Sequence, residues 1–176
     1  VQAGAHPLVA SAEGKDQIAA AVLRAGTGAA PPVDAQPAEL TGRVLRYADL
    51  KPADDAKPAA RKPDTTFTFD LTGSESSYEW GINGKSFDEL DPFDVQQGER
   101  VRVVFRNKSS MWHPMHLHGH TFALDGTGTR KDTVIVRPKE SVAVSFDADN
   151  PGQWMLHCHN TYHLEAGMAA KLAYVR

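Results

Sequence analysis

From about residue 65 onward, short runs of alternating apolar and polar residues are separated by turn residues. Runs of this length with a period of two predict β-strands. The expected strands are 66–71, 78–82, 100–105, 133–136, 141–146 and 168–175. Asn83 and Gly84, directly after the second run, are a hairpin-turn signal. Since no run shows the period of a long amphipathic helix, the pattern predicts an all-β sandwich or barrel over residues 64–176.

The first 63 residues have a different pattern. Residues 29–63 are rich in Ala, Pro and charge, which predicts a connecting segment that runs over a surface. One apolar run inside it, 44–47, is a candidate strand. Residues 1–28 show no partner segments of their own, so we interpret them as the remnant of a preceding domain. Because the chain begins with Val1 rather than Met, we expect a processed product or a fragment of a longer chain.

The composition excludes some classes of protein and partner but does not by itself indicate a function. Of 176 residues, 41% are hydrophobic and 23% are charged, as in soluble globular proteins that bury a core. The net charge of -3 and the absence of a basic stripe in the sequence argue against nucleic acid as a partner. The longest apolar run, 18–23, is far shorter than the roughly 18 residues of a membrane span.

Histidine and cysteine are distributed unevenly. Seven of the eight histidines fall in two windows, 112–120 and 157–168, and the only cysteine, Cys158, lies in the second. A single cysteine excludes an internal disulfide. An isolated buried histidine or cysteine is usually a packing residue, but that explanation does not account for so many at these spacings. It does suffice for His6 and His120, which we expect to be structural or supporting.

The spacing in the two windows predicts which side chains meet. Residues two apart on a strand project from the same face. We therefore expect His116 and His118 to project together. On the second strand, His157 and His159 should share one face, with Cys158 on the opposite face. The two pairs of imidazoles suit a metal site, so one strand would serve two sites.

The second window is expected to fold back after its strand. Asn160 is a favoured helix N-cap and Gly167 a favoured residue after a helix end, so residues 161–166 should form one or two helical turns. The turn would bring a further imidazole and a thioether to the thiol face. Two His, one Cys and a weak axial Met are the ligand set of blue-copper electron-transfer sites. The expected ligands are His113, Cys158, His163 and Met168.

The two windows, HPMHLHGH and HCHNTYHLEAGM, closely resemble the copper motifs of the last cupredoxin domain of multicopper oxidases, and HLEAGM resembles laccases in particular. The resemblance covers residues 64–176 and implies a cupredoxin-like Greek-key β-sandwich or barrel. More weakly, residues 1–28 resemble the end of the middle domain of a three-domain enzyme.

The resemblance also implies a role for each motif residue. A type 1 copper would be bound by His113, Cys158, His163 and Met168. A type 2 copper would be bound by His116, and a type 3 pair by His118, His157 and His159. The complete trinuclear cluster of the family uses eight histidines, and this chain offers four of them. The other four would come from two HxH motifs in an N-terminal cupredoxin domain of the same enzyme or in a neighbouring subunit.

The implied function is that of a copper-dependent oxidase. A small reductant, phenol-like or a metal ion, would lose one electron at a time to the type 1 copper through an exposed ring edge of His163. The electron would then pass along Cys158 to His157 and His159, and the cluster would reduce O₂ to water. With half of its ligands, the chain alone is expected to be inactive. The alternative is a non-catalytic blue-copper electron-transfer or copper-binding protein, for which the second imidazole set has no use. A copper nitrite reductase is less consistent with the His-Cys-His tripeptide.

One position departs from part of the family. Many bacterial members place an acid directly after the second type 1 histidine, where it helps to relay protons. Here Leu164 holds that position and Glu165 follows, as in laccase-like members, so the sequence does not identify the residue that would relay protons. The resemblance also implies a secreted or periplasmic location.

Overall fold

The computed structural model describes residues 1–12 and 17–175, and the chain divides into two compact units, Val1–Leu45 and Arg46–Arg176. In the smaller unit, β1 (Gly4–Ser11) pairs antiparallel with β2 (Ile18–Ala25). The expectation that residues 1–28 hold no partner segments was therefore wrong. The pairing was hidden because four of the eight residues of β2 are alanine and β1 mixes small residues with a proline, so neither strand shows a clear alternation.

The segment expected to be connecting chain contains three short 3-10 helices: η1 (Ala38–Thr41), η2 (Tyr47–Asp49) and η3 (Asp54–Ala56). The candidate strand at 44–47 was wrong. The 3-10 helix η2 begins at the last residue of this range, and within the described residues no strand pairs with 44–46. Tyr47 and Leu50 pack against the core of the larger unit, and the Tyr47 hydroxyl accepts a hydrogen bond from the Ile135 N–H at 2.6 Å.

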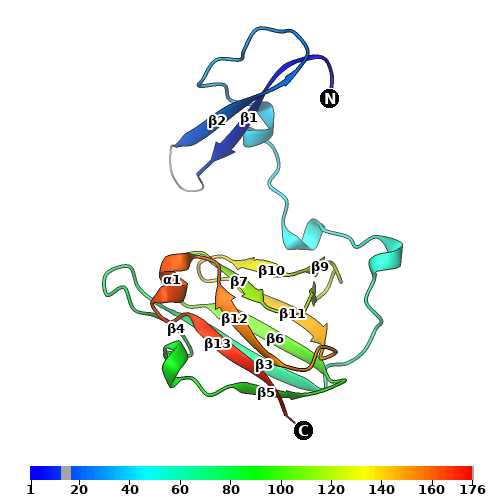
Figure 1. Ribbon diagram of the computed structural model, residues 1–176, viewed down its shortest axis with the longest axis vertical. Helices are drawn as coiled ribbons and strands as arrows, with labels where there is room; N and C mark the ends of the chain where they lie inside the picture. The colour runs from blue at the N-terminus through cyan, green and yellow to red at the C-terminus, as the bar shows by residue number, and fades with distance from the viewer. Residues whose placement is uncertain (13–16, 176) are drawn as a thin grey trace. The chain divides into compact units, whose positions relative to one another are not determined.

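The larger unit is a two-layer sandwich, shown with its strand labels in Figure 1. One layer is a five-stranded sheet in the order β10-β7-β12-β13-β5. Its strands are β10 (Thr133–Val136), β7 (His113–Leu117), β12 (Gln153–Cys158), β13 (Ala169–Val175) and β5 (Phe93–Gln96). All neighbours are antiparallel except β13 and β5.

The other layer is a six-stranded sheet in the order β4-β3-β6-β11-β8-β9. Its strands are β4 (Trp80–Ile82), β3 (Thr65–Gly73), β6 (Arg100–Asn107), β11 (Ser141–Asp147), β8 (Phe122–Leu124) and β9 (Arg130–Lys131). Here β3 and β6 are parallel. The 3-10 helix η4 (Phe87–Glu89) precedes β5, and α1 (Thr161–Glu165) lies beside β12 and β4.

The six predicted strands of this unit are confirmed, with one shortened. The run at 78–82 becomes a strand only from Trp80, because Tyr78 has a φ of 57°, outside the β region. The hairpin turn at Asn83 and Gly84 is confirmed, with φ angles of 54° and 75°. The all-β sandwich is therefore confirmed, while β5, β8 and β9 were missed because two to four residues carry too little alternation.

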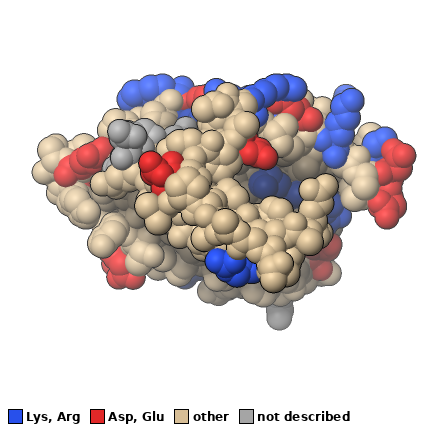
Figure 2. Space-filling model, turned by 90° about the horizontal axis from the view of Figure 1, so that it is seen from above, with Lys and Arg blue, Asp and Glu red and all other residues tan. Residues whose placement is uncertain are grey.

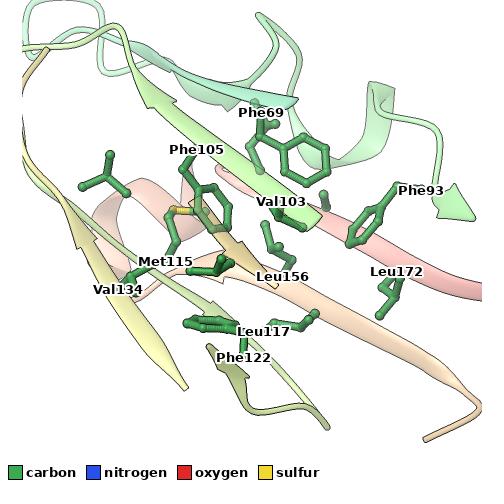
Figure 3. Packing of buried hydrophobic residues seen from close by; sticks show 14 of the residues in the cluster. Phe69, Phe93, Val103, Phe105, Met115, Leu117, Phe122, Val134, Leu156 and Leu172 are labelled. Atoms are coloured by element: carbon green, nitrogen blue, oxygen red, sulfur yellow. The ribbon is translucent and has the colours of Figure 1, made fainter. Parts of the chain in front are cut away.

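The core fills the space between the two sheets, as Figure 3 shows. On β7, Met115 and Leu117 point inward with His113, whereas His116 points to the other face. On β12, Leu156 and Cys158 contribute to the core. His157 stands between them in the sequence and projects from the opposite face of the strand, towards His116 and His159. The five-stranded sheet thus presents one set of candidate metal-binding side chains to the interior and another to its outer face.

The surface carries both signs of charge. In Figure 2, Lys and Arg are interspersed with Asp and Glu, and neither sign gathers into a large patch on the visible face. Among residues 1–12 and 17–175, no helix is both long enough and apolar enough to cross a membrane.

Candidate copper centres

The first set of candidate ligands is His113, Cys158, His163 and Met168. His113 opens β7 and Cys158 closes β12, its neighbour in the sheet. The predicted helical turn is confirmed as α1, whose N-cap Asn160 accepts a hydrogen bond from the backbone of Tyr162. It places His163 beside Cys158, and the chain then returns to β13 through Met168.

The donor atoms of the first set converge inside the protein. His113 Nδ1 and His163 Nδ1 are 3.0 Å apart, and Cys158 Sγ lies 3.8 Å and 3.6 Å from them. With bonds of the length found for zinc, an ion in trigonal geometry needs nitrogens about 3.5 Å apart and a sulfur about 3.7 Å from each. The sulfur–nitrogen distances of 3.8 Å and 3.6 Å match this geometry, and the nitrogens, at 3.0 Å, would have to move apart slightly to admit an ion. The donor types are those of a blue-copper site.

Met168, the fourth candidate ligand, is fully buried. Its carbonyl oxygen accepts a hydrogen bond from the Cys158 N–H at 3.1 Å, and its own N–H donates to the His163 carbonyl at 2.9 Å. The backbone therefore holds the thioether residue next to two other members of the set.

A hydrogen-bond network fixes which nitrogen of His113 faces the site. Ser109 Oγ donates to Asn107 Oδ1 at 2.8 Å, so at its contact of 2.7 Å with His113 Nε2 it must accept. The proton of the neutral His113 ring is thus on Nε2, and the lone pair of Nδ1 points to Cys158 and His163. The ring is oriented for metal binding before any ion arrives.

Burial sets the protonation states of the first set. It lowers the pKa of His113 to about 3, with a smaller contribution from nearby His163, and it also lowers the pKa of His163. Burial raises the pKa of the Cys158 thiol to about 11. Both imidazoles are consequently neutral at ordinary pH, whereas the thiol must lose its proton to bind a metal.

An indole ring that the sequence analysis did not identify covers this set. Trp80 is 3% exposed, and its ring centroid lies 4.1 Å from that of His163 and 5.4 Å from that of His113. A Cβ on Gly73 would fall 2.5 Å from the indole, so Gly73 makes room for it. The indole N–H is buried without an acceptor among the described residues, a departure from normal pairing that is typical of functional sites.

The expected exposed ring edge of His163 was wrong. The residue is only 2% exposed, because Trp80 covers its ring and Asn160 Nδ2 lies 3.3 Å from its Nε2. The fold-back of α1 was predictable from its cap at Asn160, but the Trp80 indole reaches His163 through packing that the local sequence does not encode.

The second set is His116, His118, His157 and His159. His157 lies directly opposite His116 across β7 and β12, and ligand atoms of His116, His157 and His159 all lie within 4.8 Å of one another. His118 Nε2 is 2.9 Å from His157 Nε2. Unlike the first set, this set reaches the surface, where His118 and His159 are exposed.

Backbone carbonyls orient two rings of the second set. His116 Nδ1 donates to the Asp132 carbonyl at 2.7 Å, and His157 Nδ1 donates to the Cys158 carbonyl at 3.0 Å. In the neutral rings, Nε2 is then free to bind a metal. Burial and the neighbouring imidazoles lower the pKa values of His118 and His159, which favours the neutral form of both rings.

The structure leaves two histidines outside both sets. His6 lies in the hairpin of the smaller unit and contacts the Gln2 carbonyl. His120 is buried, and its ring contacts the Tyr174 hydroxyl and the backbone carbonyl of His118 rather than any imidazole of the second set. Leu164 and Glu165 lie on α1, and Glu165 is exposed.

Comparisons with known proteins agree with this geometry. A family model described as multicopper oxidase matches residues 60–175. The multicopper oxidase MmcO of Mycobacterium tuberculosis is 43% identical over 176 residues, covering 98% of this chain and 35% of that protein. Laccase-4 of Trametes villosa is 46% identical over 92 residues, covering 44% of this chain and 18% of that protein.

Among solved structures, that of Fet3p, described as a multicopper oxidase that functions in iron import, superposes with a TM-score of 0.68 at 22% identity, covering 90% of this chain and 40% of that one. The cupredoxin-like fold is thereby confirmed. The chain spans about a third of the length of MmcO and less than a fifth of laccase-4. By its family match and its likeness to MmcO, the chain belongs to the multicopper oxidase family.

Proposed function

We propose that this chain carries the type 1 copper site and half of the oxygen-reducing cluster of a laccase-like oxidase. The observation that carries the proposal is the His157-Cys158-His159 tripeptide at the end of β12. Its thiol joins two imidazoles in the interior, and its two imidazoles join two others on the outer face of the same sheet. One strand end thus belongs to two metal-binding sets.

In this proposal the first set holds the type 1 copper. His113, Cys158 and His163 supply the trigonal donors, and Met168 supplies the axial thioether. The bound copper would accept single electrons from a reductant, and the cluster would use them to reduce O₂ to water. The protein's part is to keep water out with Trp80 and to connect the two sets through Cys158 and its flanking histidines.

The second set would contribute His116 to the type 2 copper and His118, His157 and His159 to the type 3 pair. Four imidazoles cannot fill the coordination of three copper ions, so the exposed side of the set would face four more on an N-terminal cupredoxin domain. That domain would belong to the same enzyme or to a neighbouring subunit. Residues 64–176 would then be the C-terminal cupredoxin domain, 29–63 its connecting segment and 1–28 the end of a preceding domain.

The reductant is proposed to be small, either phenol-like or a metal ion, and the enzyme to work in a secreted or periplasmic location. A non-catalytic blue-copper protein remains the competing outcome. It would keep the first set in use and leave the second without copper even in the complete assembly.

Oxygen consumption with a phenolic donor distinguishes the two. The purified chain, loaded with copper, should turn blue and consume no oxygen, whereas addition of the N-terminal cupredoxin part should start turnover. Sustained turnover by the chain alone, with three or four coppers bound, would refute the half-cluster. Absence of turnover and of further copper in the full assembly would favour the non-catalytic protein.

A further inference from the structure

His120 is the histidine of the first window that neither ligand set uses. It is 8% exposed, so both ring nitrogens need partners within the protein. Its Nδ1 lies 3.1 Å from the carbonyl oxygen of His118, and its Nε2 lies 2.6 Å from the hydroxyl of Tyr174.

These contacts fix the tautomer of His120. A carbonyl oxygen only accepts, so Nδ1 carries the proton and donates to His118. In the neutral ring Nε2 is then the acceptor, and the Tyr174 hydroxyl donates to it. The Tyr174 oxygen in turn accepts from the Asn150 N–H at 3.3 Å. Tyr174 also stacks against the imidazole, with an interplanar angle of 14° and a centroid distance of 5.9 Å.

The residue that His120 contacts lies beyond the end of a strand. Because β7 ends at Leu117, His118 is not part of the regular strand pairing of β7. Its N–H still donates to the Met155 carbonyl at 2.9 Å, and its carbonyl accepts from His120. The peptide groups before and after its Cα are thus both held, which fixes the direction of the Cα–Cβ bond.

The next residue is held as firmly. Gly119 has a φ of 71°, and a Cβ there would lie 2.5 Å from the Trp154 ring. Its carbonyl accepts from Asn150 Nδ2 at 3.0 Å, and the Trp154 indole donates to the Asn150 carbonyl at 2.8 Å. The turn that carries His118 is therefore tied to β12, which presents His157, and through Tyr174 to β13.

The imidazole of His118, by contrast, is exposed and has no protein partner outside the second set in the described chain. Its Nε2 contacts His157 Nε2, and its ring lies 4.9 Å from that of His116. Its direction consequently depends on the backbone from which it projects.

We propose that His120, whose tautomer is fixed by the His118 carbonyl and whose ring is held by Tyr174, is a positioning residue that holds the turn after His118 and so aims the His118 imidazole at His157. The inference rests on the proposed role of the second set as copper ligands. A ring that is already aimed avoids part of the ordering cost when metal binds. Loss of such supporting partners typically lowers metal affinity by about 10- to 100-fold.

The test uses the metal-free chain with ¹⁵N-labelled histidine, and its readout is the two-bond ¹H–¹⁵N spectrum. The spectrum is recorded at about pH 8, well above the ordinary imidazole pKa of about 6.5. His120 should then show the Nδ1–H pattern. His118 should show one Nε2–H pattern, because His157 donates through Nδ1 to Cys158 and can only accept at Nε2.

Two matched variants separate positioning from packing. His120→Asn keeps an N–H donor near the place of Nδ1, whereas His120→Gln moves it to the place of Nε2. We expect His118 to keep its single pattern in the Asn variant and to show mixed tautomers or broadened signals in the Gln variant. The signals of His113 and His163 should stay unchanged in both.

An Nε2–H pattern for His120 in the unchanged chain would overturn the inference. So would a His118 spectrum that is the same in both variants, or equal changes in His113 and His163. If the Gln variant does not fold, Tyr174→Phe provides the second test. It removes the donor to His120 Nε2 and the acceptor of the Asn150 N–H, and it should broaden or mix the His120 patterns because the His118 carbonyl alone then orients the ring. Because no metal is present, failure of this inference is seen separately from failure of copper to bind the second set.

Discussion

Replacing Ser109 by alanine should weaken both the fold and the first ligand set. Ser109 Oγ accepts hydrogen bonds from His113 Nε2 at 2.7 Å and from the Met111 N–H at 3.2 Å, and it donates to Asn107 Oδ1. Asn107 Oδ1 keeps a second donor, the Ser109 N–H at 2.9 Å, and remains paired in the variant. Two donors therefore lose their acceptor, and the one on His113 is fully buried.

The size of the effect follows from these two groups. A buried donor without a partner costs about 1–3 kcal/mol, and the partly buried Met111 N–H adds about 1 kcal/mol more. The free energy of unfolding of the metal-free chain should thus fall by about 2–4 kcal/mol. For a unit of this size that corresponds to a drop in Tm on the order of 10 °C. Since His113 also loses its preset orientation, copper affinity should fall by about 10- to 100-fold.

Thermal unfolding followed by circular dichroism and competitive copper titration measure the two effects. Ser110→Ala is the matched control, because Ser110 is exposed and adjacent. The blue colour should persist in Ser109→Ala at saturating copper, since all four ligands remain. If Ser109→Ala and Ser110→Ala have the same Tm and the same copper affinity, the assigned orientation of His113 is wrong.

Three further predictions concern the first set. Cys158→Ser should abolish the intense blue absorption of the copper-loaded chain, since the colour requires Cu(II)–thiolate charge transfer; a blue variant would remove Cys158 from the site. Met168→Leu should retain the colour and raise the reduction potential in a redox titration, because loss of a weak donor destabilises Cu(II); loss of copper binding would refute the axial role. Copper affinity should rise about tenfold per pH unit between about pH 7 and 9. Burial raises the pKa of the Cys158 thiol to about 11, so the thiol must release a proton when copper binds. His113, with a pKa of about 3, is already neutral and releases none. An affinity that does not change with pH would contradict a protonated thiol.

Much of the fold and of both ligand sets could be predicted because the signals are local. Strand alternation assigns His157 and Cys158 to opposite faces. The N-cap at Asn160 and the glycine at 167, with its φ of 111°, mark the helical turn that returns His163 to the thiol. These signals act over a few residues and need no knowledge of distant contacts.

The features that were missed depend on tertiary packing. Trp80 covers His163 from a strand of the other sheet, and no local pattern states which imidazole it will meet. For the same reason the ring edge of His163 was expected to be exposed and is buried. The Ser109 contact with His113 spans four residues, yet its direction is set by Asn107, which is held in turn by the Val136 carbonyl.

The alternation at the end of β12 also determines which sequence changes the site can tolerate. A strand has a side-chain period of two, so insertion or deletion of one residue exchanges its two faces. Between Leu156 and Cys158, such a change would bring an imidazole into the apolar interior and the thiol to the outer face. Substitutions there can be graded in effect, but a change in length removes both ligand sets at once. We expect natural and engineered variants of this strand to differ in residue identity and never in residue number.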